Sequence, residues 1–283
     1  MAPKILQASA YSRASLVSFL NSAPLSYNNL DWISNRDRLE DPYCYLFTED
    51  EQIQALISCE PENQIAAWLR FFYCQSDGKH AWYFQSLLTH AIKDLRAFGV
   101  QELYALSFKS WLDKLLSDNA FTPFTQIITL RRPTSLDQST EPHPGVILRP
   151  MSPEDLPETI TLDHEAFSPP WQLNTRSLRA AYCACSYNTV ALSEGRIIAY
   201  QMTASSFDAS HLARLAVSPL HQHRGVGSML VLDTLREAAE RGSTEMTVNT
   251  QVDNSESLNL YKRLGFQPEG KLIPVLQKSV PEA

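Results

Sequence analysis

One order of secondary-structure signals occurs twice along this 283-residue chain, and it constrains the fold more than any other feature. Each copy predicts a strand, a loop, a long helix, a strand and a short helix. The first copy runs from an apolar strand at 65–74, through a helix at 81–98, to a short helix at 111–116. The second begins with a strand at 211–217 and ends with a short helix at 255–264. We interpret this order as an internal duplication, with two unrelated α/β domains as the alternative.

A proline-rich break separates the two copies. Residues 133–144 hold three prolines and several hydroxyl residues, a composition that forms no regular element and is typical of an interdomain linker. We therefore expect one α/β domain at 1–132 and a second at 145–283, each long enough to bury a core of its own.

Composition and charge limit the partners. The chain carries 24 Lys and Arg against 31 Asp and Glu, a net charge of −7, so it lacks the broad positive surface that nucleic acid requires. An acidic chain tolerates a cationic partner, such as an amine, better. Residues 1–7 lack the apolar core of a signal peptide, and no apolar run approaches the length of a membrane span. We expect a cytoplasmic protein without nucleic-acid or membrane partners, and the oligomeric state is left open.

The cysteines predict no metal site. They form no C-x-x-C pair, and we expect small buried hydrophobic residues, as is common in a reducing compartment. Cys183 and Cys185 would bind a metal only with further ligands, and His164 and His211 lie at no recognisable ligand spacing. The five cysteines are Cys44, Cys59, Cys74, Cys183 and Cys185.

The segment Gln222-His223-Arg224-Gly225-Val226-Gly227 leads into the predicted long helix of the second copy. The first amides of a helix have no intrahelical partners, and a loop that turns them toward one point binds anions. Two of the nine glycines of the chain fall here, where a phosphate would approach the backbone closely. A dinucleotide fingerprint would need a third glycine at Leu230, and the Gly-Lys-Ser/Thr of a P-loop is absent. A tight strand-to-helix turn without a ligand remains the alternative.

Several further motifs accompany this loop in the second half. They are Leu215-Ala-Val-Ser-Pro219, Gln222-x-x-Gly-x-Gly227, Asn254 and Leu260-Tyr261-x-x-Leu264-Gly265-Phe266. Together they resemble the GNAT N-acetyltransferase superfamily, and Leu162 to Trp171 is similar to the first-helix signature of its ribosomal-protein N-terminal acetyltransferase branch. The resemblance covers about residues 145–280 and implies, with the duplication, tandem GNAT-like domains, each a central mixed, mostly antiparallel sheet flanked by helices.

The resemblance implies acetyl-CoA as cosubstrate, no metal, and a primary amine as acceptor, either a small molecule or a protein N-terminus. It implies that Leu215 to Val217 pair with the pantetheine arm, that amides from His223 through Ser228 hold the pyrophosphate, and that Tyr261 donates a proton to the departing thiolate. As alternatives, Asn254 is a plain helix N-cap and Tyr261 a core aromatic residue. The implied cofactor-binding residues are Leu215, Ala216, Val217, Gln222, His223, Arg224, Gly225, Val226, Gly227, Ser228, Asn254 and Tyr261.

One position departs from the ribosomal-protein branch. A glutamate is expected there as general base, and the chain has Asn249, which takes up no proton at neutral pH. Glu165 and Asp208 are candidates by charge alone. The base is thus unassigned, or a water chain carries the proton, or the substrate differs from that of the ribosomal-protein branch. A non-catalytic CoA-binding sensor or interaction module, or an anion-binding scaffold, stands as the alternative to the acetyltransferase.

The first copy lacks the chemistry of the second. Its loop has one glycine, Gly78, and places Asp77 where phosphate charge would lie, while Leu116 takes the position of the proton donor. We therefore expect residues 1–132 to form a degenerate GNAT-like domain that completes the fold or forms part of the substrate groove.

Overall fold

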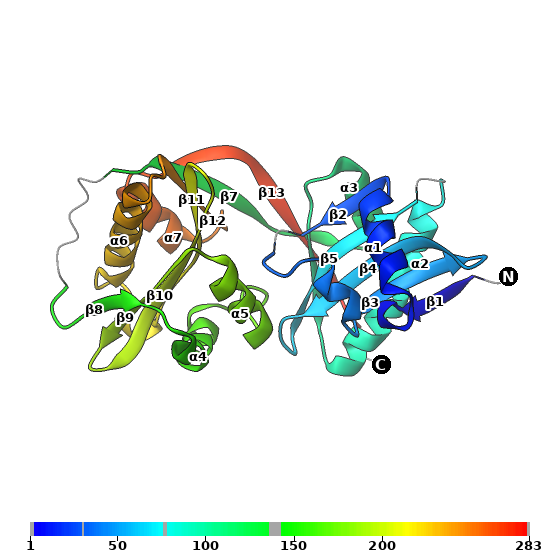
Figure 1. Ribbon diagram of the computed structural model, residues 1–283, viewed down its shortest axis with the longest axis horizontal. Helices are drawn as coiled ribbons and strands as arrows, with labels where there is room; N and C mark the ends of the chain where they lie inside the picture. Colours follow the sequence, from blue (N-terminus) through cyan, green and yellow to red (C-terminus); the bar gives the residue numbers. More distant parts are fainter. Residues whose placement is uncertain (1–2, 30, 76–77, 136–142, 282–283) are drawn as a thin grey trace. The chain divides into compact units, whose positions relative to one another are not determined.

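The computed structural model describes residues 3–29, 31–75, 78–135 and 143–281. The chain divides into two compact units (Figure 1). Unit 1 comprises Met1–Phe124 and Pro274–Ala283, and unit 2 comprises Thr125–Ile273. The predicted contiguous domains, 1–132 and 145–283, therefore differ from the observed division at both of its boundaries.

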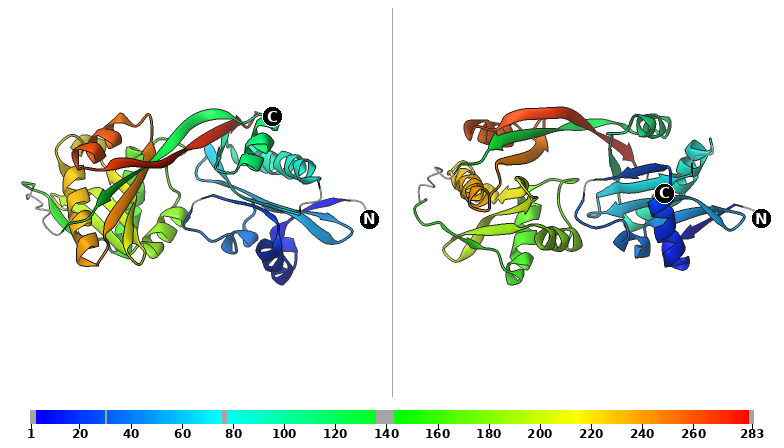
Figure 2. Two further views of the ribbon diagram at one scale, coloured as in Figure 1. Left: turned by 90° about the horizontal axis from the view of Figure 1, so that it is seen from above. Right: turned by 45° about the horizontal axis from the view of Figure 1, so that its top comes forward.

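Two long strands explain the difference. β7 (Thr122–Pro133) begins in unit 1 and continues in unit 2, and β13 (Gln267–Ser279) begins in unit 2 and ends in unit 1. Figure 2 shows the two strands side by side, as their neighbouring places in the sheet require. Strand pairing is non-local, so the composition of residues 133–144 indicates where regular structure ends but not which unit a strand joins. Residues 136–142 of that predicted linker lie outside the described residues.

Unit 1 contains a mixed sheet in the order β1-β3-β4-β5-β6-β13. Only β5 and β6 pair in parallel among the registers of this unit, and a further strand, β2, pairs with β5. The elements are β1 (Lys4–Gln7), η1 (Ala8–Ala10), α1 (Arg13–Ser22), β2 (Leu25–Asn28), η2 (Asp37–Glu40), β3 (Cys44–Glu49), β4 (Gln52–Pro61), β5 (Ala66–Cys74), α2 (His80–Phe98), β6 (Glu102–Leu106) and α3 (Ser110–Asp118).

Unit 2 contains a mixed sheet in the order β7-β12-β11-β10-β9-β8. β11 and β12 pair in parallel, and the other pairs are antiparallel. The elements that follow β7 are β8 (Ile147–Pro150), η3 (Pro153–Asp155), α4 (Leu156–Ala166), α5 (Thr175–Ala184), β9 (Tyr187–Ser193), β10 (Arg196–Ser205), β11 (Ala209–Val217), η4 (Pro219–His221), α6 (Val226–Glu240), β12 (Glu245–Gln251) and α7 (Ser255–Arg263).

The repeated order predicted from the sequence is confirmed. β5, α2, β6 and α3 in unit 1 correspond to β11, α6, β12 and α7 in unit 2, and each unit has the expected mixed, mostly antiparallel sheet with helices. The end signals were informative too. Gly242 follows α6 with φ at +89°, where the amides of Gly242 and Ser243 bond back to Ala239 and Ala238.

The helix that follows each parallel strand packs its apolar side on the sheet. In unit 1, Phe84 and Leu87 of α2 are fully buried against Leu69 and Phe72 of β5. In unit 2, Leu230 of α6 is buried together with Ala199 and Ile198 of β10 in the same apolar cluster. Each such side chain contributes roughly 1.5–3 kcal/mol by leaving water, and this packing fixes the start of α6 beside the end of β11.

Candidate active site

A cavity of about 410 Å³ lies in unit 2 where β11 ends and α6 begins, with α7 along one side. It combines backbone of a strand edge, a glycine loop and the first turn of a helix. Its lining residues are Ala166, Phe167, Leu215, Ala216, Val217, Gln222, His223, Gly225, Gly227, Ser228, Asn254, Glu256, Ser257, Leu260 and Arg263.

The end of β11, beyond a fork between two parallel strands, forms the strand side of the cavity. β11 and β12 pair from Ala209↔Glu245 to Leu212↔Val248, although the strands continue to Val217 and Gln251. On its other edge β11 stays paired with β10 as far as Val217. Within the described residues, the edge of β11 beyond Leu212 therefore has no strand beside it in unit 2, and the cavity-lining stretch 215–217 lies on that edge.

A turn with two left-handed residues connects β11 to α6. His223 has φ at +59° and Gly225 has φ at +88°, and Gly225 is the N-cap of α6. A side chain at Gly225 would strain the backbone wherever there was space. Gln222 is held in the turn because its side-chain amide donates to the Val217 carbonyl at 3.1 Å. The turn thus aims the first amides of α6, which have no intrahelical acceptor, at the cavity.

Gly227 sets the width of the cavity. A Cβ atom there would lie 3.5 Å from Leu260 Cδ2 and 3.6 Å from Val217 Cγ2, two residues that line the cavity on opposite elements. These are ordinary contact distances, so an alanine fits, but any longer side chain enters the space between β11 and α7. Glycine at this position therefore keeps the cavity open.

The charges around the cavity are exposed. His223 Nε2 lies 3.6 Å from Glu256 Oε1, with the two side chains 74% and 65% exposed, so this pair contributes little in water. Arg263 also lines the cavity. Arg224, predicted to hold the pyrophosphate, is absent from the described lining, and its carbonyl oxygen lies 2.6 Å from His143 Nε2.

Tyr261 lies in the core of unit 2. Its side chain is 4% exposed, and its ring packs edge-on against Phe266 at 5.6 Å between centroids. Burial raises the pKa of its hydroxyl, so the phenol keeps its proton at neutral pH. The neighbouring Leu260 lines the cavity and Tyr261 itself does not. The structure thus agrees with a core aromatic residue, and the proton-donor role stays a prediction.

Asn254 has both properties that the sequence suggested. Its side chain accepts the Ser257 amide at 3.0 Å and so caps α7, and it also lines the cavity. Of the other residues predicted to bind the cofactor, Val226 is 1% exposed and packs in the core. The structure brings together on the cavity Leu215, Ala216, Val217, Gln222, His223, Gly225, Gly227, Ser228 and Asn254.

Neither acidic candidate for the base lines the cavity. Glu165 is exposed on α4, and Asp208 lies in the connection between β10 and β11, where its carbonyl accepts the Thr244 amide at 2.8 Å. Asn249 stands on β12 one residue beyond the last pair with β11, and its Oδ1 accepts the Thr129 hydroxyl at 2.8 Å. The position where a base was expected is thus at the fork, without a carboxylate.

Sequence reasoning missed a buried polar cluster behind the cavity wall. Asp163 Oδ2 accepts Arg214 Nε at 2.8 Å and Nη2 at 2.5 Å, and it also accepts the Tyr200 hydroxyl. Arg214 lies 3.8 Å from the ring centroid of Phe167, which lines the cavity, and donates to the Trp171 carbonyl at 2.7 Å. A charged residue inside the apolar stretch 211–217 was the signal that could have revealed it.

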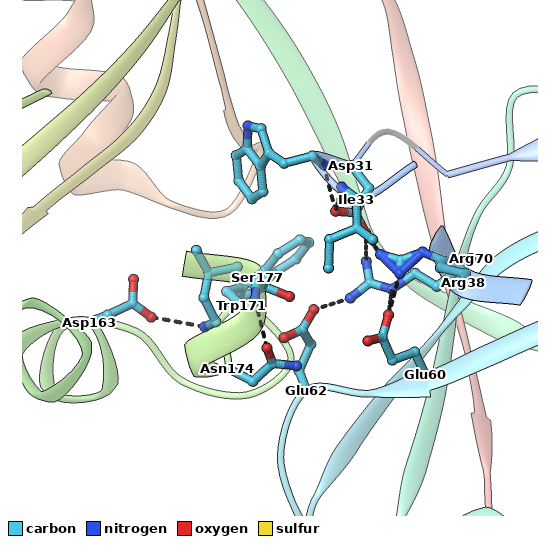
Figure 3. Close-up of polar contacts among 12 residues, drawn as sticks. Asp31, Ile33, Arg38, Glu60, Glu62, Arg70, Asp163, Trp171, Asn174 and Ser177 are labelled. Atoms are coloured by element: carbon cyan, nitrogen blue, oxygen red, sulfur yellow. Dashed lines mark hydrogen bonds and ion pairs between the residues drawn. The ribbon is translucent and has the colours of Figure 1, made fainter. Parts of the chain in front are cut away.

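The same cluster fixes the connection from α4 to α5. Asp163 Oδ1 accepts the Leu173 amide at 2.9 Å, and Asn174 caps α5 by accepting the Ser177 amide at 2.7 Å; Figure 3 shows Asp163, Asn174 and Ser177. This connection therefore holds Phe167 in place at the cavity.

The described residues offer no metal centre. No three His, Cys, Asp or Glu side chains gather among them as a metal ion would need. All five cysteines are free; four are buried as expected, but Cys183 is exposed because it lies on the outer side of α5. Among the described residues, each helix is too short or too polar to cross a membrane.

Comparison with known proteins identifies this arrangement. The model of the acetyltransferase (GNAT) family matches residues 156–266. A [ribosomal protein bS18]-alanine N-acetyltransferase of Salmonella typhimurium is 27% identical over 116 residues, which cover 41% of this chain and 77% of that protein. A mycothiol acetyltransferase of Clavibacter sepedonicus is 28% identical over 131 residues, 44% of this chain and 43% of that protein.

A solved structure described as a tandem GNAT protein from the clavulanic acid biosynthesis pathway covers 100% of both chains, with a TM-score of 0.63 at 12% identity, which shows the fold alone. The chain therefore carries a GNAT acetyltransferase domain at residues 156–266 within a tandem GNAT fold. Similarity of this domain to the family implies that acetyl-CoA is the acetyl donor.

Proposed function

We propose that unit 2 binds acetyl-CoA in the 410 Å³ cavity and transfers the acetyl group directly to a primary amine. One observation carries the proposal: the free edge of β11, the left-handed turn and the start of α6 line one cavity. An extended chain with its own amides can pair with a free strand edge, and a pyrophosphate fits the start of a helix. Acetyl-CoA has both parts: the pantetheine arm carries the amides, and the pyrophosphate follows the arm.

The fork then receives the reacting end. With the pyrophosphate at residues 223–228, the pantetheine arm runs along Val217 and Leu215 toward Leu212, where the strands part. The register of β10 and β11 shifts between Met202 and Thr203, so that Ala213 is an extra residue on β11. Such a bulge re-aims backbone groups and supplies an amide for the thioester carbonyl oxygen, which gains negative charge as the amine attacks.

The transfer needs two proton movements. The amine nitrogen attacks the carbonyl carbon, the carbon–sulfur bond breaks, the departing thiolate takes a proton, and the new amide loses one. Tyr261, protonated and one residue from the cavity-lining Leu260, is the proposed proton source. We propose a protein N-terminus as acceptor, supported by the similarity to an alanine N-acetyltransferase over 77% of that protein.

Binding and transfer test the proposal separately. Calorimetry should show one acetyl-CoA per chain. Thiol release from acetyl-CoA, followed by mass spectrometry, should show one acetyl group added to a peptide that begins with alanine or to another amine of a panel. Binding without transfer to any amine would favour a CoA-binding sensor, which the Asn249 position also suggests. Absence of binding would refute both.

Tyr261→Phe separates catalysis from binding. Loss of the phenol proton should lower kcat by about 100-fold, within the usual range for a general acid. The acetyl-CoA dissociation constant should change by no more than about two-fold, because Tyr261 does not line the cavity. Equal losses of kcat and binding would instead show that the residue is structural.

A further inference from the structure

The proposed acetyl transfer leaves one proton without an acceptor, because Asn249 stands where the base was expected. A base must reach the nitrogen that attacks at the fork, directly or through one water molecule. The base is therefore expected among the side chains beside the last pairs of β11 and β12, on the face of the sheet that carries Asn249.

His211 lies at this place. It is paired in register with Thr247 of β12, one pair before the strands part at Leu212↔Val248. Thr247 and Asn249 are two residues apart on β12 and so point to the same face. The Thr247 hydroxyl lies 2.8 Å from His211 Nδ1, which places the imidazole on that face as well. The ring is therefore next to the position that lacks a carboxylate, and like Asn249 it lies at the fork, outside the lining of the 410 Å³ cavity.

The Thr247 contact orients the ring for proton uptake. In the tautomer whose Nδ1–H donates to the Thr247 hydroxyl oxygen, Nε2 carries the free lone pair, and among the described residues it has no hydrogen-bond partner. The side chain is only partly buried, so a water molecule or an amine can approach it. A histidine with one nitrogen oriented and the other open has the arrangement of a general base.

The electrostatic surroundings keep the ring neutral. Burial lowers the pKa of His211 below its ordinary value, so at neutral pH the imidazole is unprotonated and able to accept a proton. Its strand partners, Ala204 on β10 and Thr247 on β12, are uncharged. Charged side chains on β11, β12 and α4 have partners of their own.

Three charged groups on the packed elements illustrate this. Arg214 of β11 pairs with Asp163 of α4. Glu245 of β12 pairs with Arg131. On α4, Glu158 accepts the Ile197 amide at 3.0 Å.

We propose that His211 is the general base of the transfer, accepting the proton of the attacking amine at Nε2 directly or through one water molecule. The assignment rests on the proposed function of unit 2. The amine nitrogen bonds to the acetyl carbon as the carbon–sulfur bond breaks, the amine proton goes to His211, and the thiolate takes the proton of Tyr261. The products are an amide and free CoA, after which imidazolium and tyrosinate exchange protons with water.

The test compares His211→Gln with His80→Gln, a matched change in unit 1, at saturating acetyl-CoA and a reactive amine of the panel. His211→Gln should lower kcat by about 100-fold or more and leave acetyl-CoA binding within about two-fold. The acid limb of kcat against pH should disappear with it, and His80→Gln should change neither. Asn249→Glu in the His211→Gln chain should recover part of kcat, because it restores a base at the fork.

The outcomes separate this assignment from the proposed function. Failure of the wild type to bind acetyl-CoA refutes the proposed function. If the wild type transfers acetyl groups and His211→Gln keeps more than about a third of kcat, the assignment of His211 as base is overturned, while the proposed function stands. If no amine of the panel reacts, imidazole NMR decides: the His211 signals should differ between the CoA and acetyl-CoA complexes, and identical signals would place the ring away from the acetyl group.

Discussion

The fork between parallel strands is open in unit 2 and closed in unit 1. In unit 1, β5 and β6 pair from Ala66↔Glu102 to Trp68↔Tyr104, as β11 and β12 do in unit 2. Beyond that point β2 pairs with β5, from Leu25↔Cys74 to Asn28↔Phe71. The chain itself occupies the edge that corresponds to the cavity-lining edge of β11. Among the described residues, the same architecture thus leaves a free strand edge in unit 2, where it lines the cavity, and a paired edge in unit 1.

Tyr27 completes the closure of unit 1. The fully buried Tyr27 hydroxyl donates to the Leu69 carbonyl at 3.4 Å and accepts the Leu106 amide at 3.2 Å, so it joins β2, β5 and β6 at the fork. Leu116, at the place of Tyr261, is fully buried and has no proton to give. Asp77 lies outside the described residues, and the interpretation of residues 1–132 as a domain without cofactor stays a prediction.

Unit 1 also holds a cluster of buried charges, shown in Figure 3. Arg38, with its side chain 1% exposed, pairs with Asp31 and Glu60, and Arg70 pairs with Asp31 at 2.8 Å and with Glu62. Burial alone would raise the pKa of Asp31, but Arg70 and Arg38 outweigh it and hold that pKa below its ordinary value. In this unit the buried charges stabilise the fold. We therefore expect changes in this cluster to leave acetyl-CoA binding unaltered.

The largest expected effect is on that cluster. Arg38→Met should destabilise the protein by about 3–5 kcal/mol, because it removes one of the two arginines that balance the buried carboxylates of Asp31 and Glu60. The folded pKa of Asp31 is lowered, so this stability is present above the ordinary carboxyl pKa and is lost as pH falls through the lowered one. Urea unfolding of wild type and variant should therefore differ most near neutral pH and converge in acid.

Arg13→Met is the matched control, since Arg13 pairs with Glu40 at the surface, with side chains 51% and 69% exposed. It should change stability by less than about 1 kcal/mol. Acetyl-CoA binding should be unaltered in both variants below their unfolding temperatures. Weaker acetyl-CoA binding in Arg38→Met alone would show that unit 1 contributes to cofactor binding, contrary to the proposed roles of the two units.

Gly227→Leu should close the open fork. The added side chain has to enter the space between Val217 and Leu260, and the acetyl-CoA dissociation constant should rise by about 100-fold, roughly 2.7 kcal/mol. Gly227→Ala, whose Cβ makes ordinary contacts, should bind within a few-fold of wild type. Calorimetry on the two variants measures both dissociation constants. Equal acetyl-CoA binding by Gly227→Leu and wild type would show that the cofactor lies elsewhere.

Tyr27→Phe tests the closed fork. It removes the acceptor of the buried Leu106 amide and should cost about 1–3 kcal/mol of stability, with no change in acetyl-CoA binding. Tyr11→Phe, which loses only an exposed hydrogen bond to the Glu51 carbonyl, should cost less. Thermal unfolding of the two variants provides the comparison. A second acetyl-CoA bound by Tyr27→Phe would mean that β2 merely covers a working site.

Local signals predicted the elements well. The helices after residues 80 and 225, the stop at Gly242 and the cap at Asn254 were all readable, since each depends on a few neighbouring residues. Most of the predicted cofactor-binding residues line the cavity because one turn and one strand end carry them.

Non-local features were not readable. The paths of β7 and β13, the pairing of β2 with β5, and the joining of Asp163 to Arg214 depend on residues distant in sequence. In the sequence, His211 lies at no recognisable metal-ligand spacing and nothing else marks it as functional. Its place beside Thr247 is evident only once the register of β11 and β12 is known.

The course of β7 and β13 governs the order of assembly. β12 pairs with β7, which precedes the proline-rich break. A polypeptide that starts at residue 145 would therefore expose the unpaired edge of β12, which promotes aggregation. β6 pairs with Val275–Ser279, which are synthesised after the residues of unit 2. The sheet of unit 1 is therefore completed only after unit 2 has been synthesised, so neither half is a product that translation could finish and release alone.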